Sequence, residues 1–247
     1  MFDIRLAESI TKGGQLAIRH VGRVVNEYLN AMLKTDTDYV VYTDTDSIYV
    51  KLDIIVERMG LSGETPQAIT KMLDQFCEAK MLPCIRDGYE GLKTYTNAYA
   101  QKMIMAREVI AERGVFCKKK RYFMSVWNSE GTQYDKAKTK VMGLDLVKSS
   151  TPQFVRDAMS TTVDMILGPN ESDVQDYIAT FKQEFKSQPP EAIAFPRGVN
   201  KMEESYCNGH GEFMAGVTVP INSRAAINFN QYSKKLGIDQ NYQEIVG

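Results

Sequence analysis

The chain has 247 residues, enough for one large domain or two smaller ones, and its 43% hydrophobic content excludes wholesale disorder. Its formal net charge of −1 predicts no polyanionic partner from overall charge, so any nucleic-acid surface must be a local one. No apolar run approaches the length of a membrane span, and four cysteines without a C-x-x-C pair favour free thiols in a reducing compartment. These features predict a soluble, intracellular protein with no membrane partner.

The first 52 residues predict a long helix followed by a β-hairpin. Apolar residues from Ala7 to Met32 recur at spacings near three and four, and the interruption at Gly13-Gly14 is interpreted as a bend or a close-packing point. Two β-branched runs, 39–42 and 47–52, then predict strands that flank a turn without glycine.

The next segment predicts one more helix and then a group of strands. Thr65 and Pro66 form a helix start, and Pro83 is expected to kink or split that helix. Residues 99–127 have strand-like alternation with a break near 112–114, and residues 132–142 return as a strand after a turn.

After Gly143 the sequence becomes mostly helical. Ser150, Thr151 and Pro152 predict a helix start by side-chain capping, and further helices are expected over 171–185 and from Pro220 onwards. The predicted fold class is therefore α+β, with an antiparallel sheet flanked by helices over residues 1–143 and a mostly helical unit over 144–247.

The predicted hairpin turn carries two carboxylates, Asp44 and Asp46. Two such hard oxygen ligands on rigid strands can hold Mg²⁺, which prefers carboxylates together with substrate phosphates. Asp-x-Asp also occurs in ordinary turns, because Asp and Thr bond their own backbone there. The chain has the same tripeptide at residues 36–38, which we interpret as a solvated turn, so spacing alone leaves both readings open.

The context of this pair resembles a known family. The run from Tyr42 to Val50, YTDTDSIYV, is similar to the Y-G-D-T-D-S motif of family B DNA polymerases, with Thr43 where the family has glycine. The resemblance implies that Asp46 is a Mg²⁺ ligand, that Asp44 supports catalysis or contacts metal, and that Thr45 lies at the nucleotide site.

Two further segments are similar to the same family in the same order. MIMAREVI, residues 103–110, resembles a palm strand that carries a catalytic carboxylate, which falls on Glu108; Ala106 stands where the family often has Asp. The run KKKRY resembles the K-K-R-Y motif, which implies contacts from Lys119, Lys120, Arg121 and Tyr122 to primer-template DNA. Residues 113–140 support this, with eight Lys/Arg against two Asp/Glu, because phosphates attract such a patch.

The helical unit is similar to the junction of palm and thumb in the polymerases of tailed bacteriophages of the myovirus type. By this resemblance Ser149, Ser150 and Thr151 cap a helix or bind phosphate, and Arg197 and Arg224 are DNA contacts or structural ion-pair partners. The implied domains are a C-terminal part of the palm, 1–143, and an incomplete thumb, 144–247.

Family motifs that supply the second metal-binding aspartate, the fingers and the exonuclease are not found in the sequence. We therefore expect a two-metal polymerase that extends a primer with dNTPs only together with an upstream half, and no activity from this chain alone. Whether it is a split subunit or a truncated product stays open. A sliding clamp is a possible partner, although the clamp-binding tail is not found. The expected location is the cytoplasm of a bacterial host infected by the phage.

Two other functions remain as alternatives. A non-catalytic fragment that binds primer-template DNA would need only the basic segment. A glycosyltransferase-like enzyme would use Asp-x-Asp with a metal and a nucleotide-sugar, but the strand-helix alternation of a nucleotide-binding sheet is missing.

Overall fold

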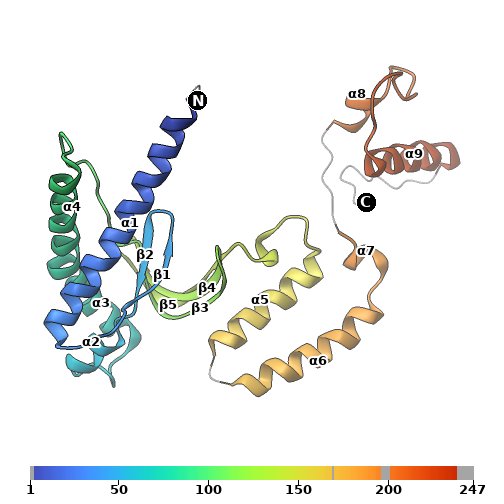
Figure 1. Cartoon of the computed structure of the whole chain (residues 1–247). Coiled ribbons are helices and arrows are strands. Elements are labelled where there is room, and N and C mark those ends of the chain that lie inside the picture. The colour runs from blue at the N-terminus through green and yellow to red at the C-terminus, as the bar shows by residue number, and fades with distance from the viewer. Residues whose placement is uncertain (1–2, 169, 196–200, 238–247) are drawn as a thin grey trace. The chain divides into compact units, whose positions relative to one another are not determined.

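The computed structural model describes residues 3–168, 170–195 and 201–237, and it divides the chain into two compact units, 1–142 and 143–247 (Figure 1). The predicted fold class, α+β with an antiparallel sheet flanked by helices, is confirmed, although the strands form two small sheets and not one. None of the helices in the described ranges is long and apolar enough to cross a membrane.

The first unit combines helices with two separate antiparallel sheets. Its elements are α1 (Ile4–Leu33), β1 (Val40–Asp44), β2 (Ser47–Val50), α2 (Asp53–Arg58), α3 (Pro66–Phe76), the π-helical turn η1 (Cys77–Met81), α4 (Leu82–Thr96), β3 (Val109–Lys118), β4 (Arg121–Ser129) and β5 (Thr132–Met142). The strand order is β1-β2 in one sheet and β3-β4-β5 in the other.

The core of this unit forms where the second half of α1 packs on α4. Val21, Val25 and Leu29 of α1 are fully buried, each one turn from the next, as a helix with one core-facing stripe requires. Close approach of the helices depends on Gly88 of α4, because a Cβ there would lie 3.0 Å from a methyl group of Val24. Packing of these buried residues therefore fixes the position of α1, and with it the position of the β1–β2 hairpin that follows.

Two predicted interruptions of regular structure are wrong. α1 is continuous through Gly13-Gly14, and no neighbouring atom comes within 4 Å of an added Cβ, so these glycines neither interrupt the helix nor serve as a close-packing point. β3 is likewise continuous across residues 112–114, and the expected break is instead absorbed by register shifts against β4 on either side of Ala111.

A third correction concerns the strand predicted from residue 99. Residues 101–108 have no regular structure, and β3 begins only at Val109. Tyr99 and Ile104 are almost completely exposed, so the alternation that suggested a strand does not correspond to a buried face. Without a pairing partner, this segment cannot satisfy a strand's backbone hydrogen bonds.

The helix starts of the chain differ in how well the sequence predicted them. Thr65 caps α3 as expected, its hydroxyl oxygen accepting from the amide of Ala68 at 3.3 Å, and the π-turn η1 ends two residues before Pro83. The capping predicted for Ser150 and Thr151 is wrong, because α5 begins without a side-chain cap and the Thr151 hydroxyl donates to the carbonyl of Asp145 at 2.6 Å.

The second unit is mostly helical in its described parts. It contains the short 3₁₀ turn η2 (Asp145–Val147), α5 (Gln153–Leu167), α6 (Glu171–Ser187), α7 (Pro190–Ile193), α8 (Met202–Tyr206) and α9 (Ile221–Leu236). α5 and α6 pack through stacked rings of Phe154 and Phe181, whose centroids are 5.4 Å apart.

Candidate metal and nucleic-acid site

The tip of the β1–β2 hairpin presents both predicted carboxylates. Asp44 ends β1 and pairs with Ser47, so Thr45 and Asp46 form a two-residue turn. Thr45 has a φ of 49°, a left-handed conformation that usually calls for glycine or asparagine. The turn is held by the carbonyl of Asp44, which accepts from the Asp46 amide at 2.6 Å and the Ser47 hydroxyl at 3.1 Å.

The departure of Thr43 from the family's glycine is explained by this geometry. Thr43 lies in the extended strand opposite Ile48, and its side chain is exposed. The residue that needs a left-handed backbone is Thr45, two positions later. A side chain at position 43 therefore leaves the shape of the turn unchanged.

The predicted DNA-contact segment lies against the hairpin tip. Lys119 and Lys120 form the turn between β3 and β4. The ammonium of Lys120 donates to Asp44 Oδ1 at 2.6 Å and to the hydroxyl of Thr45 at 3.3 Å, while its backbone N–H donates to the phenol oxygen of Tyr42 at 2.7 Å. Two motifs about 75 residues apart in the sequence thus meet in space, as a shared site requires.

The charge of Lys120 changes the pKa of Asp44. Hydrogen bonding to this ammonium holds the pKa of the Asp44 carboxyl below its usual range, and the same contact raises the pKa of Lys120. Asp44 is only 18% exposed, whereas Lys120 is 60% exposed. The pair is therefore charged at neutral pH, and on acidification it is lost only as pH falls below the usual range for an aspartate.

Four aromatic rings join the hairpin to the three-stranded sheet. Tyr42 and Tyr49 from the hairpin pack on Phe116 and Tyr122 from the sheet, with ring centroids 4.7 to 5.9 Å apart. The Tyr49 and Tyr122 hydroxyls share a 2.6 Å hydrogen bond, and burial raises the pKa of Tyr49. Tyr122 is 5% exposed, so in this structure its ring faces the hairpin; its predicted contact with primer DNA stays a prediction.

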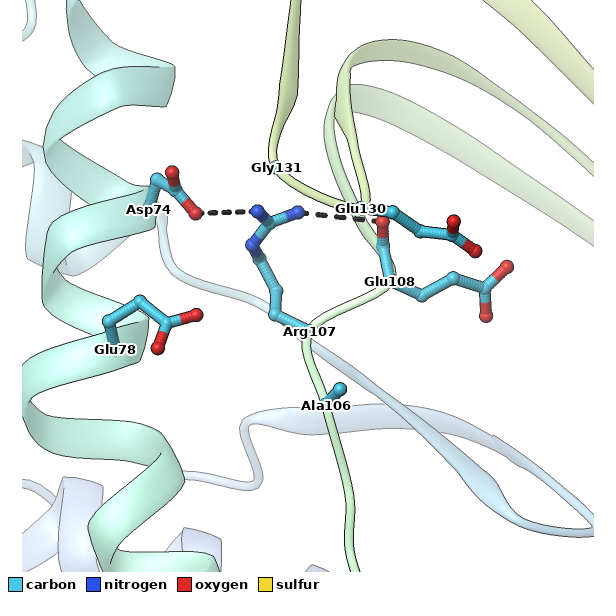
Figure 2. Close-up of a pocket in the computed structure, with 7 residues that line it drawn as sticks. All are labelled: Asp74, Glu78, Ala106, Arg107, Glu108, Glu130 and Gly131. Atoms are coloured by element: carbon cyan, nitrogen blue, oxygen red, sulfur yellow. Dashed lines mark hydrogen bonds and ion pairs between the residues drawn. The ribbon is translucent and has the colours of Figure 1, made fainter.

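Glu108 directly precedes β3, and a backbone hydrogen bond fixes its position. Its carbonyl accepts from the amide of Glu130 at 2.7 Å, and its carboxylate forms an ion pair with Lys140. The neighbouring Arg107 is 10% exposed and reaches the opposite way, to Asp74 of α3 at 2.6 Å. Figure 2 shows this arrangement, with Arg107 extended towards the helix and the Glu108 carboxylate pointing away from it.

These side chains line an open cavity of about 430 Å³ between α3 and the β4–β5 turn. The lining residues are Asp74, Glu78, Ala106, Arg107, Glu108, Glu130 and Gly131 (Figure 2). Four are acidic, and one guanidinium faces them. The Asp74–Arg107 pair anchors to α3 the segment that carries Glu108, a connection that the sequence did not suggest.

The carboxylates fit Mg²⁺ only as part of a ligand set. Asp46 is exposed, and its side chain has no hydrogen bond or ion pair with the described residues, whereas Asp44 and Glu108 each pair with a lysine. No group of three His, Cys, Asp or Glu side chains in the described ranges is arranged to hold a metal. A hard cation here would need oxygen ligands from elsewhere, such as phosphates or a further carboxylate.

The remaining predicted DNA contacts are distributed unevenly. Lys119 and Arg121 are exposed at the turn beside the hairpin, and Ser149 and Ser150 are exposed in the second unit. Thr151 is buried. Arg224 on α9 is exposed, with its guanidinium 5.7 Å from the ring centre of Phe213. Arg197 lies outside the described residues.

Comparison with known proteins finds similarity to two phage DNA polymerases. No protein-family model matches the chain. The DNA-directed DNA polymerase of Enterobacteria phage T4 is 32% identical over 247 residues, covering 96% of this chain and 27% of that protein. The DNA-directed DNA polymerase of Escherichia phage RB69 is 34% identical over 243 residues, covering 94% of this chain and 26% of that protein. The chain thus spans about a quarter of the length of these relatives.

Proposed function

Since the resemblance to phage DNA polymerases extends over nearly the whole chain, we propose that it supplies the palm and thumb part of a DNA-directed DNA polymerase that extends a primer with dNTPs. The observation that carries the proposal is the contact between Lys120 and Asp44. It brings the two most specific motifs of the sequence together in one site, although nothing in the local sequence demands that they meet.

Each part of this site has a distinct role in the proposal. Asp46 holds Mg²⁺, and Asp44 adds a second carboxylate oriented by Lys120. Mg²⁺ supplies charge neutralisation at the phosphates that react. Lys119, Lys120 and Arg121 hold the primer-template, the lysines through phosphates and minor-groove acceptors found in every base pair. The primer 3′-hydroxyl loses its proton to solvent, and its oxygen forms a bond to the α-phosphorus of the dNTP as the bond from that phosphorus to pyrophosphate breaks.

The proposal includes a partner polypeptide. Two-metal transfer needs a further carboxylate, and Asp46 is the one candidate ligand in the described ranges that is not already paired with a lysine. We propose that this carboxylate, the fingers and an exonuclease come from an upstream polymerase half in the cytoplasm of an infected bacterium. On this basis the chain alone binds DNA without extending a primer.

The test is reconstitution of primer extension from two polypeptides. The chain is mixed with the part of the T4 polymerase that it does not match, and incorporation of labelled dNTP is measured with Mg²⁺. We expect Asp46→Ala to abolish extension, by about 10³-fold or more for the loss of a metal ligand. Asp36→Ala, in the same tripeptide at an exposed loop, is the control and should leave the rate unchanged.

Two outcomes would change the proposal. Undiminished extension by Asp46→Ala would show that the metal role is wrong. Salt-dependent duplex binding without extension in any reconstitution would favour the second candidate, a non-catalytic fragment that binds primer-template DNA. The observation that favours this non-catalytic alternative is that the described residues contain no group of three metal ligands.

A further inference from the structure

Lys120 is the residue where the two motifs touch, and its backbone is in an uncommon conformation. Its φ is 60°, in the left-handed region that side-chain-bearing residues rarely adopt. Such a conformation persists when neighbouring contacts hold it in place. The contacts here come from the hairpin, since Lys120 donates its amide to Tyr42 and its ammonium to Asp44.

Tyr42 is itself fixed on three sides. Its ring stacks on Phe116 at a centroid distance of 4.7 Å and tilts against Tyr49 and Tyr122 at 5.5 and 5.9 Å. These rings belong to both the hairpin and the sheet, so the phenol oxygen of Tyr42 has a defined position relative to both. It accepts the Lys120 amide at 2.7 Å from that position.

We propose that Tyr42 is a positioning residue for DNA binding, and that it acts through Lys120 by holding the Lys119–Lys120 turn in the conformation that receives the duplex. The inference rests on the proposed function, in which this turn contacts primer-template DNA. It adds that the carboxylate hairpin and the DNA-contact turn move as one body.

The energetic consequence follows from pre-organisation. A turn already fixed in its bound conformation loses less conformational entropy when DNA binds. Tyr42→Phe keeps the ring and its packing but removes the oxygen that accepts the Lys120 amide. A single hydrogen bond of this kind corresponds to a change of about fivefold in an equilibrium constant.

The chain offers a matched control in Tyr39. Its hydroxyl forms a 2.7 Å hydrogen bond with the Thr35 hydroxyl, and its side chain is 3% exposed in the core of the same unit. Tyr39→Phe thus removes a buried phenol hydrogen bond of the same length at a place that touches neither motif. It measures what a purely structural loss does to DNA binding.

The experiment measures binding of the intact chain to a fluorescein-labelled primer-template duplex by anisotropy, over a series of NaCl concentrations. We expect Tyr42→Phe to weaken binding about fivefold and Tyr39→Phe to leave it unchanged. In a Lys120→Gln background the effect of Tyr42→Phe should become smaller, because the ammonium that Tyr42 positions is gone, although the backbone N–H that donates to Tyr42 remains. Amide hydrogen exchange should become faster at Lys120 in Tyr42→Phe and stay unchanged there in Tyr39→Phe.

The outcomes separate this inference from the function on which it rests. Equal binding by the Tyr42 and Tyr39 variants, or the same fold-change in both Lys120 backgrounds, would overturn it. Absence of salt-dependent duplex binding by the unaltered chain would overturn the proposed DNA-contact turn, and with it the role of Tyr42 in DNA binding. Unchanged exchange at the Lys120 amide would separately overturn the hold of Tyr42 on the turn.

Discussion

Removal of the Asp74 carboxylate should destabilise the first unit far more than removal of a surface carboxylate. The Arg107 side chain is 10% exposed and that of Asp74 is 29% exposed, whereas Lys12 and Glu8 of the surface pair on α1 are 70% and 56% exposed. Breaking a fully buried pair costs about 3–5 kcal/mol, because a charge is left without a partner. Since solvent still reaches part of Asp74, we expect Asp74→Ala to cost about 2–3 kcal/mol.

The single tryptophan of the chain makes this loss measurable. Trp127 lies on β4, and its indole N–H donates to Glu112 at 3.0 Å, so its fluorescence reports unfolding of the three-stranded sheet. With a urea m-value near 2 kcal/mol/M, the expected loss moves the midpoint down by roughly 1–1.5 M. Glu8→Ala, the control, should move it by less than about 0.25 M, because exposed i,i+4 pairs contribute about 0.5 kcal/mol or less.

Two results would contradict this expectation. If Asp74→Ala and Glu8→Ala unfold at the same urea concentration, the ion pair does not anchor the Glu108 segment to α3. If the double variant Asp74→Leu/Arg107→Met is as unstable as Asp74→Ala, the loss does not arise from an uncompensated charge on Arg107, because removing both charges should restore much of the stability.

Two further predictions concern the core. Gly88→Ala places a Cβ 3.0 Å from Val24 and should lower the free energy of unfolding by about 1–3 kcal/mol. Gly91→Ala on the same helix meets no atom within 4 Å and should raise the free energy of unfolding by up to about 1 kcal/mol. Urea unfolding measures both changes. Burial raises the pKa of Cys77 to about 11, so iodoacetamide should alkylate the exposed Cys117 first at pH 8. The rate of Cys77 alkylation should rise about tenfold per pH unit until the pH reaches this pKa. Equal alkylation rates for the two cysteines at pH 8 would contradict the buried environment of Cys77.

Much of the fold was predictable because its signals are local. The hairpin turn follows from β-branched runs around polar residues, and the Thr65 cap follows from a hydroxyl placed before Pro66. The segments whose structure was predicted wrongly are those in which a local sequence pattern was not matched by a contact in the folded chain. The alternation around Tyr99 had no pairing partner, and the Thr151 hydroxyl found the carbonyl of Asp145 instead of a helix end.

The residues of the candidate site could be selected from the sequence, but the contacts between them could not. The motifs predicted that Asp44 and Lys120 serve one function, yet periodicity assigns a residue to a face and cannot specify what it touches. The hydrogen bond between Tyr49 and Tyr122 spans 73 residues, and the Asp74–Arg107 pair joins a helix to an irregular segment. The aromatic residues at 42, 49, 116 and 122 can be seen in the sequence, but their spacing does not show that they form one cluster.

The long helix α1 is supported along only part of its length. It extends for about 45 Å, but no residue from Ile4 to Leu16 is buried, while Ala17, Val21 and Val25 further along are. A helical stretch of about a dozen residues without packing is marginal in water. Its amides should therefore exchange with solvent through fraying of the end, many times faster than those of the packed half, so one continuous helix will have two very different lifetimes along its axis.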